Sequence, residues 1–190
     1  NQETGEALLA GMGELHLEIT TYRIEEEQNI KVKVSEPIVV YREAINGNNV
    51  SRPFEGKSPN RHNRFYIEVE MLPLNVVEAL RAGDFRDGTI RNKDQKEIGD
   101  QFAGLGMDKD MMRKGYAING TNVFINGTKG IQGLHETREL LIEGFNEVCK
   151  SGPLAGEPAM GMLVRLTDAK LHEDAIHRGP AQTIPAMRNA

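Results

Sequence analysis

The stretch 64-RFYIEVEM-71 decides the fold of this 190-residue chain, because it alternates between two kinds of side chain without a break. Phe65, Ile67, Val69 and Met71 form one side of the pattern, and mostly polar residues form the other. A period of two is typical of a β-strand that packs one face against a core. The sequence therefore predicts a strand over 64–71 and a sheet around it.

Weaker patterns on both sides of this strand predict the other elements. Residues 46–64 and 83–122 are rich in Gly, Asn, Asp and Lys or Arg, and we expect them to be mostly loop. The remaining expectations are a helix near 75–81, a helix near 109–114, a strand at 122–126, a helix over 131–150, a turn over 151–158, a strand over 160–171 and the start of a helix at 181–190.

The first ~35 residues predict a separate α–β unit. Apolar residues recur at spacings of three and four over 8–22, which indicates an amphipathic helix. The stretch at 30–34 alternates apolar residues with Lys, as a half-buried strand does. A second strand is expected at 38–45, and Pro37 separates the two. A unit of about 35 residues with so few strands cannot bury both of its faces. We therefore place a domain boundary near Pro37. For the whole chain we expect an α+β fold, because strands and helices interleave without a regular βαβ period.

Composition excludes several classes of protein. Hydrophobic residues make up 38% and charged residues 27%, as in folded globular domains. The net charge of −5 favours no nucleic-acid partner, so RNA binding would need a local basic patch. The single cysteine, Cys149, excludes an internal disulfide framework, fits a reducing cytoplasm and is expected to be buried. No apolar run approaches the ~18 residues of a membrane helix. The chain begins at Asn1 in mid-pattern, so we expect a piece of a longer protein.

The segment 171-LHEDAIHRGPAQ-182 is the first candidate site. A zinc-binding helix needs two histidines four residues apart, whereas His172 and His177 are five apart and would diverge by about 140° on a helix. A bent loop could still bring the rings together, although no second group of Cys or His supplies further ligands. His177 with Glu173 or Asp174 could form an acid/base pair, but the sequence shows no nucleophile beside it.

The loop before the decisive strand is the second candidate. Between residues 52 and 64 it holds four basic residues and one acid, Glu55, which is a local charge of +3. Its amide and imidazole side chains could read RNA bases and sugars. A polar loop anchored on a strand is well placed to meet a partner, although a solvated loop is the plain alternative. The basic residues are Arg52, Lys57, Arg61 and Arg64, and the other polar residues are Asn60, His62 and Asn63.

Two glycine patterns fail as nucleotide sites. The stretch 126-NGTKG-130 lacks the eight-residue pattern of a phosphate-binding loop. Gly11 and Gly13 have no third glycine at the dinucleotide spacing. We therefore expect no GTP hydrolysis in this chain. We also expect no metal site, because of the histidine spacing and the missing further ligands described above.

Longer motifs resemble a known family. The stretch 3-ETGEALLAGMGELHLEI-19 resembles the domain III helix of translational GTPases of the elongation factor G and 2 group, and 33-KVSEPIVVYRE-43 resembles their crossing into domain IV. The segments 58-SPNRHNRFYIEVE-70, 127-GTKGIQGLHE-136 and 151–190 look like domain IV of archaeal and eukaryotic members. Eukaryotic members carry three glycines after the arginine, whereas Gly-Pro-Ala at 179–181 looks archaeal.

The resemblance implies the domain plan. Residues 1–36 would be the C-terminal part of domain III, a partial ferredoxin-like α–β unit. Residues 37–190 would be domain IV, with a ribosomal-protein-like left-handed β-α-β crossover that departs from the usual right-handed rule. The chain would run on toward domain V, and the domain's tip would consist of loops 57–64 and 172–179.

The resemblance also implies the function, which is translocation of tRNA and mRNA on the ribosome. The tip would enter the decoding centre and touch ribosomal RNA, with His177 as the residue that diphthamide-synthesis enzymes modify and diphtheria-type toxins ADP-ribosylate. The protein would be cytoplasmic, and GTP and Mg²⁺ would belong to a GTPase domain of the longer parent. The expected contacts are Lys57, Ser58, Pro59, Asn60, Arg61, His62, Asn63, Arg64, His172, Arg178 and Gly179.

Two other classes stay open. The same class of domain fold occurs in small-molecule kinases and isomerases, where a His-Asp-Glu loop could carry protons. Those kinases need their own glycine-rich phosphate loop, which the sequence lacks. A stand-alone RNA-binding module is the third alternative.

Overall fold

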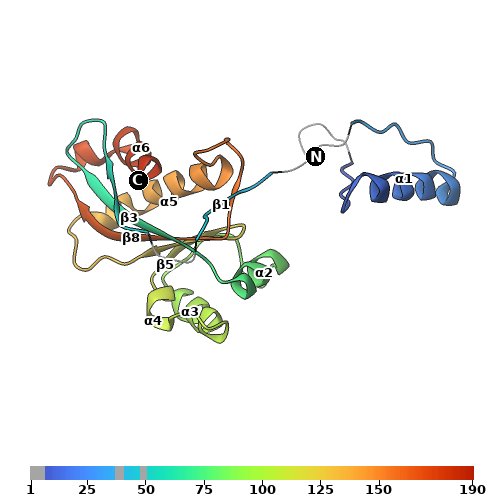
Figure 1. Ribbon diagram of the computed structural model, residues 1–190. Helices are drawn as coiled ribbons and strands as arrows, with labels where there is room; N and C mark the ends of the chain where they lie inside the picture. Colours follow the sequence, from blue (N-terminus) through green and yellow to red (C-terminus); the bar gives the residue numbers. More distant parts are fainter. Residues whose placement is uncertain (1–6, 37–40, 48–50) are drawn as a thin grey trace. The chain divides into compact units, whose positions relative to one another are not determined.

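The computed structural model describes residues 7–36, 41–47 and 51–190 (Figure 1). The chain divides into two compact units, Asn1–Val40 and Tyr41–Ala190. The net charge divides with them, because residues 1–40 hold three basic and eight acidic side chains. Residues 41–190 hold twenty of each, so the second unit is neutral.

The first unit contains helix α1, Glu14–Gln28, which confirms a helix but places its start later than the pattern predicted. None of its residues is buried, and the apolar side chains of Leu15, Ile19 and Tyr22 are exposed. The strand predicted at 30–34 is not formed. A strand needs the N–H and C=O groups of a neighbour, and the described part of this unit offers none. The predicted strand at 38–45 falls partly on residues 37–40, outside the described residues, and from residue 41 onward only Glu43–Ala44 is strand.

The second unit is built on a six-stranded sheet in the order β2-β3-β8-β6-β5-β4. All neighbours are antiparallel except β6 and β8, which are parallel and are joined through helix α5. The chain therefore makes a β-α-β crossover. The strands are β2 Phe54–Lys57, β3 Arg64–Met71, β4 Gly88–Thr89, β5 Gly115–Asn119, β6 Asn122–Asn126 and β8 Met162–Lys170.

Strand β3 confirms the decisive prediction over its full length, since the strand covers residues 64–71. Phe65 and Ile67 are buried, while their neighbours Arg64 and Glu68 retain solvent contact. The expectation of loop over 46–64 was wrong in part, because β2 lies there and pairs with β3. Its four residues include Gly56, whose added Cβ would overlap the carbonyl of Ala186, and this close approach explains the glycine within the strand.

Helices cover both faces of the sheet (Figure 1). Helices α5, Leu134–Lys150, and α6, Pro180–Asn189, pack on one face around a core that includes Phe65 and Leu141. Helices α2, Leu74–Ala82, α3, Gln95–Gly104, and α4, Lys109–Met112, pack on the other around Phe102. The mixed α and β class is thus confirmed, with an antiparallel sheet apart from one pair.

The region 83–122 is more ordered than the sequence predicted, because α3, β4 and β5 lie within it along with the expected short helix α4. Cys149, a residue of α5, is buried in the core, as expected, and burial raises the pKa of its thiol to about 12. No helix in the described parts of the chain is long and apolar enough to cross a membrane.

Helix α5 ends at Lys150 and is followed by a loop over residues 151–158, here called the base loop. It is followed by β7, Ala159–Met160, which pairs in parallel with β1, Glu43–Ala44. The carboxylate of Glu43 accepts hydrogen bonds from the backbone N–H groups of Leu154 at 3.0 Å, Ala155 at 2.8 Å and Glu157 at 3.2 Å. These bonds lower the pKa of the Glu43 carboxyl, and the bond from Leu154 has the largest effect.

Candidate functional site

The loops predicted at 57–64 and 172–179 lie side by side at one end of the sheet, here called the tip (Figure 1). Strands β3 and β8 are antiparallel neighbours, and Arg64 is opposite Lys170 in their register. The loop that enters β3 therefore meets the loop that leaves β8. More than one hundred residues of sequence separate the two loops, and the sheet brings them together.

Asn63 joins the two loops through a single side chain. It is fully buried, and its Nδ2 donates to the carbonyl oxygen of His177 at 2.7 Å. Its Oδ1 accepts from the backbone N–H of His172 at 3.0 Å. A buried amide that satisfies two backbone groups of the facing loop fixes the distance between the loops.

Asn60 adds a second set of bridges. Its Nδ2 donates to the same carbonyl of His177 at 3.2 Å. Its backbone N–H donates to Oε1 of Gln182 at 2.9 Å, which connects the loop over residues 57–64 to helix α6. The sequence contained no signal for Gln182, because the contact spans 122 residues.

The loop over residues 57–64 is a tight turn that is closed by its own hydrogen bonds. The backbone N–H of Ser58 donates to the carbonyl of Asn63 at 3.0 Å, and the N–H of Asn63 donates to Oγ of Ser58 at 2.9 Å. Arg61 lies in the left-handed region with a φ of 62°, where a residue with a side chain is uncommon. The turn therefore holds Arg61 and His62 outward while Ser58 is buried.

Three imidazole rings meet at the tip. The ring centroids of His172 and His177 are 4.4 Å apart, and His62 lies 5.0 Å from each. Nδ1 of His172 accepts from the backbone N–H of Asp174 at 3.1 Å. The bent loop thus brings the rings of His172 and His177 together. Within residues 7–36, 41–47 and 51–190, however, no group of three His, Cys, Asp or Glu is arranged to hold a metal ion.

His177 lies on one turn of 3₁₀ helix, η1, Ala175–Arg178. Asp174 begins this turn by accepting from the N–H of Ile176 at 3.0 Å, as N-terminal capping residues do. The imidazole of His177 is half-buried, whereas Ile176 beside it is 78% exposed. The turn thus presents a histidine and an apolar side chain together.

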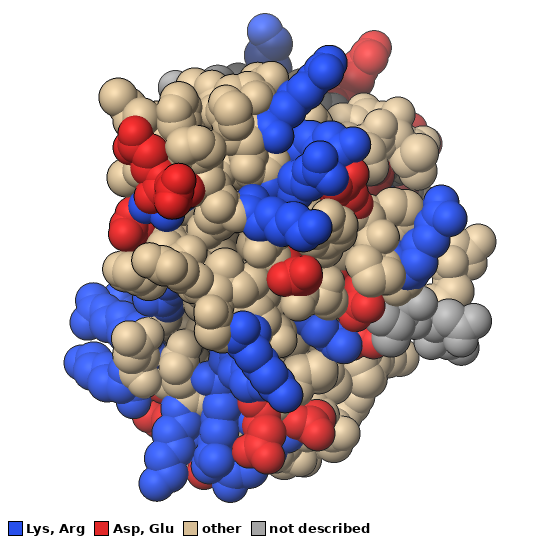
Figure 2. Space-filling view, turned by 90° about the vertical axis from the view of Figure 1, so that its left-hand side faces the viewer, with Lys and Arg blue, Asp and Glu red and all other residues tan. Residues whose placement is uncertain are grey.

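Part of the basic charge at the tip is neutralised within the chain. Glu55 pairs with Lys57 at 3.0 Å and with Arg64 at 3.1 Å, and the hydrogen bond from Lys57 is the main cause that lowers the pKa of Glu55. The exposed Arg61 projects from the same loop. Figure 2, which faces this end of the unit, shows Lys and Arg side chains spread over the surface, most densely toward the bottom, with Asp and Glu among them.

The predicted contact residues, together with His177, fall into three groups by exposure. The side chains of Ser58, Asn63 and Arg178 are buried and bind within the chain. The exposed residues are Lys57, Pro59, Arg61, His62 and Arg64, and the half-buried ones are Asn60, His172, His177 and Gly179.

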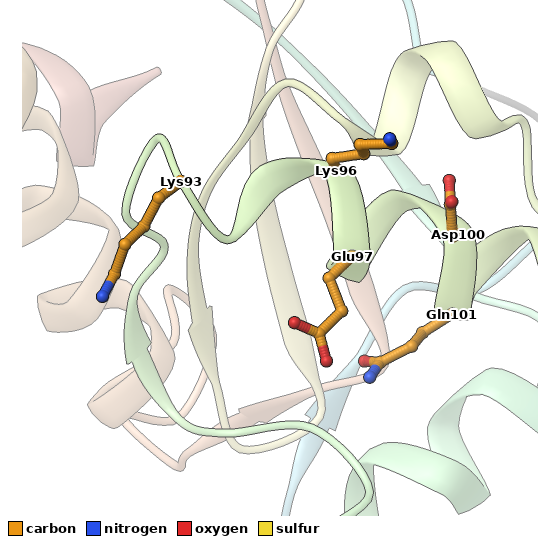
Figure 3. Close-up of a pocket in the computed structure, with 5 residues that line it drawn as sticks. All are labelled: Lys93, Lys96, Glu97, Asp100 and Gln101. Atoms are coloured by element: carbon orange, nitrogen blue, oxygen red, sulfur yellow. The ribbon is translucent and has the colours of Figure 1, made fainter.

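A surface hollow on α3 is a weaker candidate (Figure 3). Lys93 lies on the turn before α3, and the labelled side chains point in different directions without converging on one point (Figure 3). Asp100 is already engaged by Lys109 at 2.9 Å and Arg113 at 3.2 Å, and the hydrogen bond from Lys109 is the main cause that lowers its pKa. The lining residues are Lys93, Lys96, Glu97, Asp100 and Gln101.

Fold and site together define a class: a mixed α and β domain that presents two cross-bridged loops at one end of its sheet. Residues 87–190 match the family described as elongation factor G, domain IV, and residues 1–36 match elongation factor G, domain III. The chain belongs to the elongation factor G domain IV family.

Curated relatives extend this similarity to the whole chain. A protein of Thermoplasma volcanium named elongation factor 2 is 54% identical over all 190 residues, which are 26% of its length. Proteins of the same name from Picrophilus torridus and Halomicrobium mukohataei are each 55% identical over all 190 residues, covering 26% and 25% of their lengths. The chain therefore spans about a quarter of the length of these relatives.

Proposed function

We propose that this chain is part of an archaeal translation elongation factor, and that its tip enters the decoding centre of the ribosome during translocation of tRNA and mRNA. The observation that carries the proposal is similarity over all 190 residues to proteins named elongation factor 2. The tip adds support, because hydrogen bonds within the chain hold its two loops together. A small-molecule kinase, an isomerase or a stand-alone RNA-binding module has no comparable support.

The proposal extends to the domain plan, which the family matches over residues 1–36 and 87–190 support. Residues 1–36 are the C-terminal part of domain III, and 37–190 are domain IV running toward domain V. The exposed apolar face of α1 and the unpaired stretch at 30–34 fit a partial ferredoxin-like unit completed by chain outside these residues. The crossover from β6 through α5 to β8 is, in this proposal, the left-handed crossover of the family.

The roles of the tip residues follow their exposure. Exposed groups such as Arg61 and His62 contact RNA phosphates and 2′-hydroxyls. Buried groups such as Ser58 and Asn63 hold the loops for them. His177 is the diphthamide position, and it is met by the modifying enzymes and by diphtheria-type toxins. GTP and Mg²⁺ belong to the parent's GTPase domain, and the parent acts in the cytoplasm.

Substitution of the tip histidines tests the RNA role. In the longer protein that contains this chain, His62→Ala and His177→Ala should each slow translocation or raise frameshifting, because each removes a group at the RNA surface. GTP binding in the absence of ribosomes should stay normal. His135→Ala is the matched control, since His135 is a strongly exposed histidine outside the tip. A normal rate and reading frame in both tip variants would contradict the proposal.

Intact-mass analysis tests the modification. The peptide that contains His177 should carry a diphthamide-sized mass increment when the protein comes from its archaeal source. A copy expressed in a bacterium should lack it, because the modification needs dedicated enzymes. An unmodified peptide from the native source would argue against this assignment.

A further inference from the structure

Arg178 is directed into the domain, although it follows the presented His177. Its side chain is 8% exposed, and its Nη2 lies 2.5 Å from Oε2 of Glu136 in the first turn of α5. Glu136 itself is 46% exposed, so water screens the pair from one side only. The guanidinium is therefore not available to an RNA partner in this conformation.

The loop before α5 is shaped around this guanidinium. A Cβ added at Gly133, the N-cap of α5, would lie 2.1 Å from Nη1 of Arg178, which is far inside contact distance. Gly133 also has a φ of 76°, a left-handed conformation that favours glycine. The side chain of Arg178 thus packs against backbone that only a glycine leaves open.

The backbone on both sides of this contact is held as well. The carbonyl of Arg178 accepts from Oγ1 of Thr183 at 2.9 Å, and Thr183 is fully buried. The carbonyl of His177 accepts from Nδ2 of Asn63 at 2.7 Å. Two successive carbonyls are therefore fixed by buried side chains from different elements, and the imidazole of His177 projects from a backbone that cannot rotate freely.

We propose that Arg178 is a positioning residue for the tip. By pairing with Glu136 against Gly133, it holds the η1 turn to the start of α5 and sets the direction of His177, instead of contacting RNA. The functional consequence rests on the proposed role of the tip, whereas the structural claim stands by itself. Breaking the pair would leave an enclosed charge without its partner, so the turn would open to resolvate the guanidinium.

Paired glycine variants test the structural claim in the 190-residue chain. Gly133→Ala pushes a methyl group into the guanidinium. Gly130→Ala is the matched control, because Gly130 has a similar φ of 65° in the same loop but open space around it. We expect the hydrogen exchange of the His177 amide to accelerate at least tenfold in Gly133→Ala and less than threefold in Gly130→Ala. Equal acceleration in both would overturn the proposal.

Variants of the carboxylate give an independent reading if Gly133→Ala does not fold. Glu136→Ala should accelerate the same exchange, and Glu136→Gln should restore part of the protection, because an amide oxygen can still accept from Arg178. Glu139→Ala, on an exposed position of the same helix, should have no effect. An unchanged His177 amide in Glu136→Ala would overturn the proposal.

The salt dependence of ribosome binding separates positioning from contact. In the longer protein, Arg178→Ala should slow translocation but leave the slope of log affinity against log salt unchanged. Arg61→Ala should reduce that slope, because each lost phosphate contact lowers it by just under one. A reduced slope in Arg178→Ala would overturn the positioning role while the proposed function stands. If His177→Ala leaves translocation normal, the function of the tip falls and the exchange measurements still decide the structural claim.

Discussion

The two ends of the second unit are fastened by different chemistry. At the tip, the buried amide of Asn63 and the enclosed guanidinium of Arg178 join loops that are distant in sequence. At the base loop, one partly exposed carboxylate, Glu43, takes up three backbone N–H groups. Both ends bring a separate segment against the same helix-and-sheet body, yet only the tip uses buried groups, Asn63 and Arg178, for this attachment.

Burial determines how much each set of contacts contributes to the free energy of unfolding. A buried polar group that loses its partner costs about 1–3 kcal/mol, whereas an exposed charged contact is screened and contributes much less. The bonds of Asn63 involve no ionisable group, so they do not depend on pH. The tip is therefore expensive to open, and the base loop is weak and sensitive to acid.

Asn63→Ala should have the largest effect. It removes the amide that satisfies both the N–H of His172 and the carbonyl of His177, so we expect a loss of about 2–4 kcal/mol in the free energy of unfolding. Urea denaturation of the 190-residue chain measures it. Asn75→Ala is the control, because Asn75 makes one exposed bond to the carbonyl of Leu105 and should matter by less than about 0.5 kcal/mol. Equal losses would remove the distinction between buried and exposed bridges.

Thr183→Val should have an intermediate effect. The change keeps the volume of a fully buried side chain but removes the hydroxyl that donates to the carbonyl of Arg178. We expect a loss of about 1–2 kcal/mol by the same denaturation measurement. Thr167→Val, at a partly exposed position with a similar bond to the carbonyl of Tyr66, should cost less. A smaller loss at Thr183 than at Thr167 would count against the tip as the firmer end.

Glu43→Gln should have the smallest effect at neutral pH, and its size should change with acid. Hydrogen bonds from backbone N–H groups lower the pKa of Glu43 in the folded chain, and the bond from Leu154 has the largest effect. Its stabilisation is therefore present above the unfolded pKa of about 4.3 and is lost as the pH falls through the lower folded pKa. Unfolding measured from pH 7 to pH 3 should show the two proteins converging in acid. A constant difference over this range would contradict the carboxylate's role.

How far the sequence predicts the fold depends on how many apolar residues each element buries. Strand β3 and helix α5 were predicted because their periods are long and clear. Helix α3 was missed because it buries only Gly99 and Phe102, which give no helical period. The stretch at 30–34 shows the opposite error, since its good strand pattern forms no strand where the described residues of its unit offer no neighbouring strand.

The site divides in the same way. The residue patterns drew attention to both loops, and the resemblance to a family singled out His177. The meeting of three imidazoles could not be predicted, because it depends on the antiparallel register of β3 and β8. Nor does a sequence reveal that Arg178 points inward, since an arginine beside a presented histidine looks the same whether it is enclosed or exposed.

Helix α5 has a mechanical consequence, because both of its ends are attached. Its 17 residues span roughly 25 Å at the usual helical rise. Glu136 in its first turn pairs with Arg178. Its last turn leads into the base loop, whose backbone N–H groups donate to Glu43. Glu43 lies three residues after the end of the first unit. We expect a displacement at Glu43 to move the whole helix as a stiff rod. Hydrogen exchange at His177 in Gly152→Ala, which crowds Glu43, would reveal whether the far end responds.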